Sequence, residues 1–261
     1  MGAHDRWTRL LDVLGERGSL DIAEAAELLD CSTTTIRRDL DALARQMLLT
    51  RTHGGAALSA VTHALPLSYR TARRAGEKQR IAKAAADLIP RGSTVGINGG
   101  STTSEVAREL SVRSGLADEP GAPALTVVTN AINIAVELAI RPQIKLVVTG
   151  GIARSNSYEL IGPLAALSLR GLSLDYAVLG VDGVHPHSGT TTHDQGEAAA
   201  NRALAECAAT VIVVADSSKL GGQAFAQVCP TSSVSVLVTD SDAPNEITEQ
   251  FVSRNISVLR V

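Results

Sequence analysis

Apolar residues follow two different spacings along the chain, one in the N-terminal quarter and another in the remainder. The first part begins with apolar residues at helical spacing from Trp7 to Leu14, and glycines end that pattern. Residues 22–29 repeat the spacing, and a third helix is expected from Thr33. Short extended runs on both sides of Gly54-Gly55 predict a hairpin. Three helices followed by a small hairpin predict a winged helix-turn-helix.

From residue 78 onward the apolar residues form short continuous runs, rich in β-branched side chains, with helical patterns between them. Continuous runs are typical of strands that are buried on both faces of a parallel sheet. The expected strands are residues 94–98, 125–130, 144–150, 174–180, 210–216, 234–240 and 256–261. The expected helices are residues 78–89, 103–110, 131–140 and 195–208. This alternation predicts an α/β fold with ligands at the carboxyl ends of its strands.

Two segments have neither pattern. Residues 59–77, which include Pro66 and Gly76, are expected to be a linker. Residues 111–124 are polar and rich in Gly and Pro, and are expected to form a surface loop. The predicted organisation is a winged helix-turn-helix domain over residues 1–58, the linker, and an α/β domain over residues 78–261.

Composition narrows the class of protein. One Trp, three Tyr and two Phe are too few for a platform that stacks single-stranded bases. Cys31, Cys207 and Cys229 form no CxxC motif, which favours reduced thiols over a disulfide framework. The first eleven residues include charged side chains and do not form a signal peptide, and no apolar run approaches the roughly 18 residues of a membrane span. We therefore expect a soluble cytoplasmic protein without membrane contact.

Charge alone does not indicate nucleic acid, because the net charge is −3 and residues 1–57 contain seven Arg against nine Asp or Glu. The position of the arginines is more informative. Arg37 and Arg38 lie in the first turns of the third helix, where each opposes the helix dipole by roughly 0.3–1 kcal/mol unless a phosphate is near. The residues that fit a DNA-reading surface are Thr33, Thr34, Thr35, Arg37 and Arg38, with Arg51 and His53 on the wing. An acidic helical bundle with a solvated arginine pair is the alternative.

The segment Gly96–Ser104 has the composition of a phosphate-binding loop. Gly99 and Gly100 follow a buried strand, and Ser101, Thr102 and Thr103 then begin a helix, whose N-terminus favours an anion. A plain glycine turn with a hydroxyl cap is the alternative, but three hydroxyls exceed what a cap requires. No GxxxxGK[ST] motif is present, so a P-loop nucleotide site is not indicated.

Polar residues also follow the other expected strands. Asn130, Gly151, Asp182 and Lys219 each come shortly after such a strand. Each could belong to an ordinary turn, and Asp216 could be only a helix cap. Because parallel strands end at one edge of a sheet, we expect these residues to share a crevice.

The N-terminal part resembles the DNA-binding domain of the DeoR/GlpR family of bacterial transcriptional repressors. The resemblance rests on Thr35-Ile-Arg-Arg-Asp-Leu40, on Leu43 and on Arg51-Thr-His-Gly-Gly-Ala56. It implies that Thr33 to Thr35, Arg37 and Arg38 contact operator DNA. Gln46-Met47 departs from the acidic-Gly pair found in many members.

Residues 78–240 resemble the sugar-phosphate sensor domain of the same family, which is similar to ribose-5-phosphate isomerase and glucosamine-6-phosphate deaminase. The matching segments are Gly100–Thr103, Val128–Asn130, Thr149–Gly151, Gly180–Gly183, Glu197-Ala198 and Asp216–Lys219. The resemblance implies a phosphate at Gly100–Thr103 and sugar hydroxyls held by Asn130, Asp182 and Lys219. The candidate effector site comprises Gly99, Gly100, Ser101, Thr102, Thr103, Asn130, Gly151, Asp182, Glu197 and Lys219.

Two departures from the family pattern lie near this site. Asn98-Gly-Gly100 replaces Asp-Ser-Gly, and Asn201 replaces a frequent Lys. Each removes a charge, so the effector or its affinity is expected to differ from that of relatives.

The hypothesis that follows is a transcriptional repressor of sugar-metabolism genes, without a cofactor, whose operator binding responds to a phosphorylated sugar. Family analogy implies a homodimer or homotetramer. An isomerase or deaminase is the alternative, with Asp182 and Glu197 as acid and base beside Lys219. A third hypothesis is a metal site at His185, His187 and His193, although a solvent-exposed loop is the preferred interpretation of that segment. A loop that closes over the effector is a further alternative.

Overall fold

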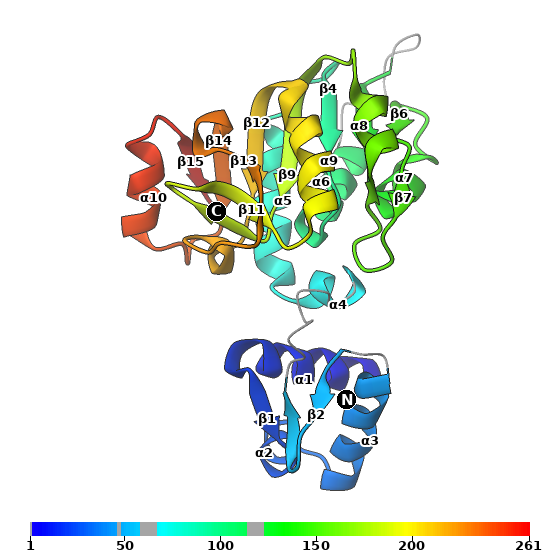
Figure 1. Ribbon diagram of the computed structural model, residues 1–261, viewed down its shortest axis with the longest axis vertical. Helices are drawn as coiled ribbons and strands as arrows, with labels where there is room; N and C mark the ends of the chain where they lie inside the picture. The colour runs from blue at the N-terminus through cyan, green and yellow to red at the C-terminus, as the bar shows by residue number, and fades with distance from the viewer. Residues whose placement is uncertain (1, 46–47, 58–66, 114–122) are drawn as a thin grey trace. The chain divides into compact units, whose positions relative to one another are not determined.

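The computed structural model describes residues 2–45, 48–57, 67–113 and 123–261, and it divides the chain into two compact units, residues 1–73 and 74–261 (Figure 1). Most of the predicted surface loop, the pair Gln46-Met47 and residues 58–66 of the predicted linker lie outside the described residues. The linker's described part contains a short helix, α4 (Leu67–Ala72). In the described part of the chain, no helix is long and apolar enough to span a membrane.

The N-terminal unit is a winged helix-turn-helix, as the sequence predicts. Its elements are α1 (Ala3–Arg17), β1 (Ser19–Asp21), α2 (Ile22–Leu28), α3 (Thr33–Arg45), β2 (Thr50–Arg51) and β3 (Gly55–Ala57). The expected hairpin is the antiparallel pair β2 and β3, and β1 adds a third strand in the order β1-β3-β2. Apolar side chains of all three helices form one core, and Leu10, Leu14 and Ile36 in it are fully buried.

Local capping explains where the helices of this unit begin and end. Gly18 ends α1 in a left-handed conformation, at φ 75°, which glycine adopts without a steric penalty. Asp21 caps α2 by accepting a hydrogen bond from the backbone N–H of Ala23. Ser32 Oγ accepts from the backbone N–H of Thr35 at 3.1 Å at the start of α3. The starts of α2 and α3 are therefore each fixed by a side chain next to them in sequence.

The second unit is built on a seven-stranded sheet in the order β15-β14-β12-β9-β4-β5-β6, with every neighbouring pair parallel (Figure 1). Its strands are β4 (Thr94–Ile97), β5 (Leu125–Thr129), β6 (Ile144–Val148), β9 (Leu174–Gly180), β12 (Ala208–Val214), β14 (Val236–Thr239) and β15 (Ser257–Arg260). All seven strands expected from the apolar runs are present, and the α/β prediction is confirmed.

Helices cover both faces of this sheet. On one face α5 (Ala75–Asp87), α6 (Ser101–Val112) and α7 (Ile132–Leu138) pack against alternate strand residues such as Val95 and Val127. On the other, α8 (Pro163–Leu169), α9 (Gln195–Glu206) and α10 (Asn245–Val252) pack against residues such as Leu179 and Val213. Burial on both faces is why the strands contain so few polar residues.

The order of the strands locates a topological switch point. After β4 the chain forms β5 and β6 on one side, and it then returns to place β9 on the other side of β4. The connections after β4 and after β9 therefore leave the sheet in opposite directions. In open α/β sheets the crevice outside the carboxyl ends of two such strands is the usual ligand site.

Two additional layers were not predicted from the sequence. The strands β7 (Ile152–Ala153) and β8 (Leu160–Ile161) form a short hairpin after β6. The strands β10 (Gly183–His185), β11 (Gly189–Thr192) and β13 (Ala226–Cys229) form a small antiparallel sheet that packs on α9. The interpretation of residues 183–193 as a solvent-exposed loop is therefore wrong. Thr190 to Thr192 are buried because their hydroxyls bond to neighbouring groups in this sheet and beside it.

Candidate functional site

The first half of α3 presents the predicted DNA-reading residues. Thr33, Thr34, Arg37 and Arg38 are all exposed, and their spacing places them on one face of the helix. Thr35 is half-buried, and its hydroxyl lies 2.9 Å from Oγ of Ser32 within the cap. The structure thus brings four of the five predicted helix residues to one solvent-facing surface, while Thr35 also shapes the start of the helix.

The two wing residues have different environments. His53 is exposed in the turn between β2 and β3. Arg51 is half-buried: its Nη1 donates to the carbonyl of Gly55 at 2.7 Å, and its Nε lies 2.9 Å from Oδ1 of Asp41. Arg51 therefore ties the wing to α3 within this unit.

Asp39, in the middle of the Thr35–Leu40 motif, was not expected to have a special role. It is buried on the inner face of α3, where it accepts hydrogen bonds from Arg6 Nε at 2.8 Å and from Trp7 Nε1 at 2.7 Å. The hydrogen bond to Asp39 raises the pKa of Arg6, which stays positively charged. The charge at position 39 therefore holds α1 against α3. The sequence offered one signal for this role, a charged residue at a position where the helical spacing of α3 calls for an apolar one.

The predicted phosphate loop lies at the switch point, at the carboxyl end of β4. Gly100 is the N-cap of α6, and Ser101 to Thr103 form the first turn of this helix. Thr103 is fully buried and its Oγ1 donates to the carbonyl of Gly100 at 3.2 Å, while Thr102 is nearly buried. The hydroxyl of Thr103 therefore stabilises the loop, and the backbone N–H groups of the first turn are the donors that an anion would meet.

Asn98 joins the two strands that flank the switch point. Its Nδ2 donates to the carbonyl of Gly180 at 2.9 Å, and its Oδ1 accepts from the backbone N–H of Gly180 at 2.8 Å. The amide nitrogen and the amide oxygen of this buried side chain thus each have a hydrogen-bond partner. The Asn that departs from the family pattern therefore extends the pairing of β4 and β9, rather than projecting toward a ligand.

Four other strands of the sheet, β12 and β9 on one side of β4 and β5 and β6 on the other, end beside the remaining predicted site residues. Asn130 follows β5, Gly151 follows β6 and Asp182 follows β9. Lys219 ends the short helix η2 (Ser217–Lys219) after β12, in a turn that Asp216 caps through the backbone N–H of Ser218 at 3.1 Å. The expectation that these positions share one sheet edge agrees with the strand order.

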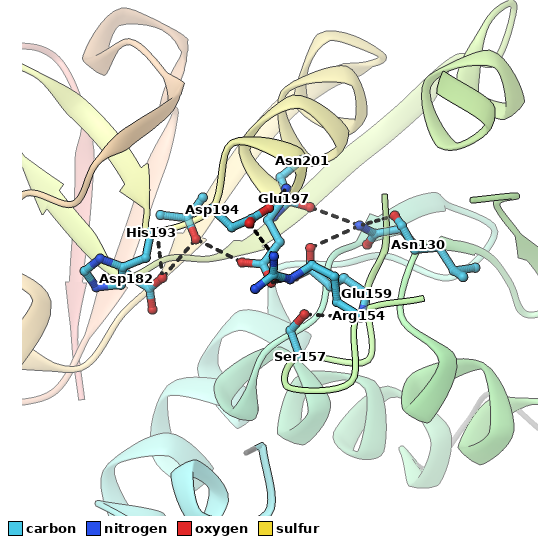
Figure 2. Close-up of polar contacts among 11 residues, drawn as sticks. Asn130, Arg154, Ser157, Glu159, Asp182, His193, Asp194, Glu197 and Asn201 are labelled. Carbon is cyan, nitrogen blue, oxygen red and sulfur yellow. Dashed lines mark hydrogen bonds and ion pairs between the residues drawn. The ribbon is translucent and has the colours of Figure 1, made fainter. Parts of the chain in front are cut away.

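A network of carboxylates surrounds the start of α9. Thr192 Oγ1 lies 2.9 Å from Asp182 Oδ2 and 3.2 Å from Glu197 Oε2. Asp194 caps α9 by accepting from the backbone N–H of Glu197 at 3.0 Å. Figure 2 shows Asp194 and Glu197 turned toward Arg154, which forms ion pairs with both of them, the one with Glu197 at 3.1 Å.

Arg154 and Glu159 were missed by the sequence analysis. Both lie on the hairpin of β7 and β8, between Gly151 and Gly162. Glu159 is buried, and its Oε2 accepts from Asn130 Nδ2 at 3.2 Å. The only signal in the sequence was the presence of two charged residues in a short segment between two glycines. That signal does not reveal which residues the hairpin contacts.

Asn130 is the centre of a buried amide cluster. Its Nδ2 also lies 3.2 Å from Oδ1 of Asn201, the residue that replaces a frequent Lys (Figure 2). Its Oδ1 is buried and has no hydrogen-bond partner among the described residues. An unsatisfied buried acceptor is uncommon in proteins, so Asn130 Oδ1 is a candidate contact for a bound molecule.

The histidines of residues 185–193 do not form a metal centre in the structure as described. His185 and His187 lie close together, with ring centroids 5.6 Å apart, and the Arg254 guanidinium is 2.9 Å from Nδ1 of His187. The backbone N–H of His193 donates to Asp182. Within the described ranges, no three His, Cys, Asp or Glu side chains are arranged to hold a metal ion.

Comparison with known families accounts for both units. A model described as the DeoR-like helix-turn-helix domain matches residues 6–62, and one described as the DeoR C terminal sensor domain matches residues 73–241. The chain belongs to the DeoR family of transcriptional regulators. Within this family it is a DNA-binding repressor with a C-terminal sensor domain.

Relatives of the DeoR family match over almost the full length. The chain is 32% identical to the HTH-type transcriptional repressor CsqR of Escherichia coli, over 97% of this chain and 94% of the relative. It is 31% identical to the glycerol-3-phosphate regulon repressor of Escherichia coli, over 97% of both. It is also 30% identical to a putative aga operon transcriptional repressor of Escherichia coli O157:H7, over 100% of this chain and 94% of that protein.

Among solved structures, one match is ribose 5-phosphate isomerase A from Methanocaldococcus jannaschii. The TM-score is 0.40 at 22% identity, and the match covers 54% of this chain and 52% of the isomerase.

Proposed function

We propose that the chain represses sugar-metabolism genes by binding operator DNA through α3, and that a phosphorylated sugar at the carboxyl edge of the parallel sheet controls this binding. The protein acts where its operator lies, which in a bacterium is the cytoplasm. Two or more copies bind together, as family analogy suggests, so that two reading helices reach successive half-sites.

The DNA-binding half of the proposal is supported by the exposed face of α3. Short hydroxyl side chains at Thr33 and Thr34 are suited to base edges or phosphate oxygens, and Arg37 and Arg38 follow them one turn later. Asp39 faces the opposite way and bonds to α1. The cations on this helix therefore project outward, although the module as a whole is acidic.

The sensing half is supported above all by one observation, the start of α6 at the switch point between β4 and β9. A helix N-terminus there offers backbone N–H groups and a favourable dipole to a phosphate. The residues proposed to hold the sugar, Asn130, Asp182 and Lys219, follow strands on both sides of β4. Arg154 joins the proposed site because it pairs with Glu197.

We assign no catalytic role to Asp182 and Glu197. Glu197 is paired with Arg154, and Thr192 lies between the two carboxylates. Asp182 also accepts from the backbone N–H of His193 at 3.3 Å. These contacts engage both carboxylates with groups of the protein itself, whereas acid–base catalysis requires one group that exchanges a proton with the substrate. Turnover of common sugar phosphates in an isomerisation assay would contradict this assignment.

A two-step experiment tests the proposed function. Selection of duplexes from a random library by the purified full-length protein yields its operator, and fluorescence anisotropy then follows operator binding. One phosphorylated sugar from a panel is expected to change operator affinity by about tenfold or more, a typical allosteric coupling. The matching unphosphorylated sugar is the control and should have no effect. If no sugar phosphate alters DNA binding or raises the melting temperature, the sensing proposal is wrong.

A further inference from the structure

The hairpin of β7 and β8, here called the strap (residues 151–162), crosses the carboxyl edge of the sheet beside the proposed effector site. Both of its ends are glycines with positive φ, 139° at Gly151 and 90° at Gly162. Its middle docks on the chain after β5, where the backbone N–H of Ile132 donates to the carbonyl of Tyr158 at 2.9 Å and that of Leu160 donates to the carbonyl of Asn130 at 2.6 Å. The strap is therefore held by a few hydrogen bonds between two glycine ends.

The strap places a carboxylate against the phosphate loop. A Cβ added at Gly99 would lie 2.4 Å from Cγ and 2.8 Å from Oε1 of Glu159, so these atoms pack directly on the Gly99 backbone. Glu159 is 3% exposed. A protein anion thus lies beside the helix N-terminus where the effector's phosphate is expected. Two anions this close repel each other strongly at the low effective dielectric of a buried site.

A second observation is a buried oxygen beside Glu159 that has no hydrogen-bond donor among the described residues. Asn130 uses its Nδ2 to hold Glu159, and its Oδ1 is left buried without a donor. A sugar hydroxyl could supply that donor, because it is small and carries a single O–H. The corner formed by Gly99, Asn130 and Glu159 therefore contains one buried acceptor, Asn130 Oδ1, that a ligand hydroxyl would satisfy.

The first half of the strap is held by ion pairs. Arg154 forms ion pairs with Asp194 and Glu197 at the start of α9 (Figure 2). These contacts do not involve the phosphate loop. The strap can consequently lose the Glu159 contact while Arg154 still holds it over the sheet edge.

We propose that Glu159 is a specificity-determining residue that occupies the phosphate position in the unliganded protein and is displaced by the effector's phosphate. The displacement undocks the strap from Asn130, and an effector hydroxyl then donates to Asn130 Oδ1. The effector must therefore combine a phosphate with a neighbouring hydroxyl, since a lone anion gains nothing from Asn130. This inference rests on the proposed function, because it assumes that a phosphate binds at the start of α6.

The test compares the full-length wild-type protein with Glu159→Gln by calorimetric titration with inorganic phosphate. Gln retains the shape and the acceptor for Asn130 but removes the negative charge, so phosphate should bind about tenfold more tightly. Asp175→Asn is the matched control. Asp175 accepts from the backbone N–H of Thr94 at the amino ends of the strands, and its loss should leave phosphate affinity unchanged.

Hydrogen exchange of the wild-type protein gives a second measurement that does not depend on how the variant folds. Added phosphate should speed exchange at the amides of Ile132 and Leu160, which report strap docking. Equal or weaker phosphate binding by Glu159→Gln, or slower exchange at these amides, would overturn the displacement. If a sugar phosphate still released DNA while the displacement was overturned, the proposed function would stand. If neither the wild-type protein nor Glu159→Gln bound any phosphorylated compound, the displacement and the proposed function would both fail.

Discussion

Trp7 Nε1 donates a 2.7 Å hydrogen bond to Oδ1 of Asp39, so the first helix of the chain is anchored to the buried side of the reading helix. Arg6 contacts the other carboxylate oxygen at 2.8 Å. The exposed arginines and the buried aspartate are adjacent in sequence, but their side chains lie on opposite faces of α3. Arg37 and Arg38 face solvent, while Asp39 determines how α3 is held in the unit.

Replacing Asp39 by Ala should destabilise the N-terminal unit by about 3 kcal/mol, because it leaves the Arg6 guanidinium and the Trp7 indole without their shared acceptor. Trp7 is the single tryptophan, so urea unfolding followed by its fluorescence reports on this unit. Asp41→Ala is the control, since its ion pair with Arg51 is largely exposed and worth less than about 1 kcal/mol. Equal losses for the two variants would contradict the anchoring role.

Arg37→Ala should weaken DNA binding on every sequence and reduce the salt dependence of the binding constant by about one unit of log–log slope. The reason is that an exposed cation on the first turns of α3 neutralises a phosphate. Arg45→Ala removes the same charge from the last turn of the helix and should have a smaller effect. The assignment fails if operator affinity is unchanged by Arg37→Ala across salt concentrations.

The double variant Thr102→Ala, Thr103→Ala should keep its operator affinity but lose the effector response. Both residues lie in the first turn of α6, and Thr103 Oγ1 stabilises the loop through the Gly100 carbonyl. Anisotropy titrations with and without the sugar phosphate measure both properties. Ser111→Ala, near the end of the same helix, should respond normally. Normal release of DNA by the double variant would show that the phosphate binds elsewhere.

Asn98→Asp should destabilise the sensor unit by about 1–3 kcal/mol near neutral pH. A carboxylate can accept from the N–H of Gly180, but its second oxygen would then face the Gly180 carbonyl in a buried site. The protonated acid can donate to that carbonyl, so the folded-state pKa of the new Asp is expected above its unfolded value. The variant should therefore recover stability as the pH falls through that pKa. Thermal unfolding at several pH values, with exposed Asn245→Asp as control, checks this.

Cys229 should be the least reactive of the three thiols. Burial raises its pKa, and it lies 3.1 Å from the Thr190 hydroxyl. Cys31 is half-buried in the turn before α3. In a colorimetric thiol assay of the native protein at pH 8, the Cys31 thiol should react at least about tenfold faster than the Cys229 thiol. A Cys31→Ser variant identifies the fast phase, and urea should make the remaining thiols react alike. The prediction would be contradicted if the Cys31→Ser variant still showed a fast phase and peptide mapping assigned the rapidly labelled thiol to Cys229.

Much of the fold could be predicted because its signals are local. Each strand of the parallel sheet is a continuous apolar run, since both of its faces are covered by helices. The caps at Asp21 and Ser32 bond to backbone groups two or three residues away. The motif around Arg37 could likewise be read without knowledge of any distant contact.

The small sheet and the strap were missed for the opposite reason. Thr190 to Thr192 look polar and loop-like, and they become buried only because Cys229 and Asp182 supply partners from other segments. Glu159 looks like any charged residue of a turn until the strap brings it against Gly99. Contacts of this kind depend on which segments meet, and nothing in the local pattern encodes the partner.

The sequence by itself determined that this protein has a winged helix-turn-helix, a seven-stranded parallel sheet and a glycine loop that begins a helix, because spacing and burial imprint these elements on consecutive residues. Only the tertiary structure decided what surrounds that loop. Asn98 turned out to pair with Gly180, 82 residues away, and Glu159 to lie on Gly99. These relationships arise from the packing of distant segments, which is where the identity of a ligand is also decided.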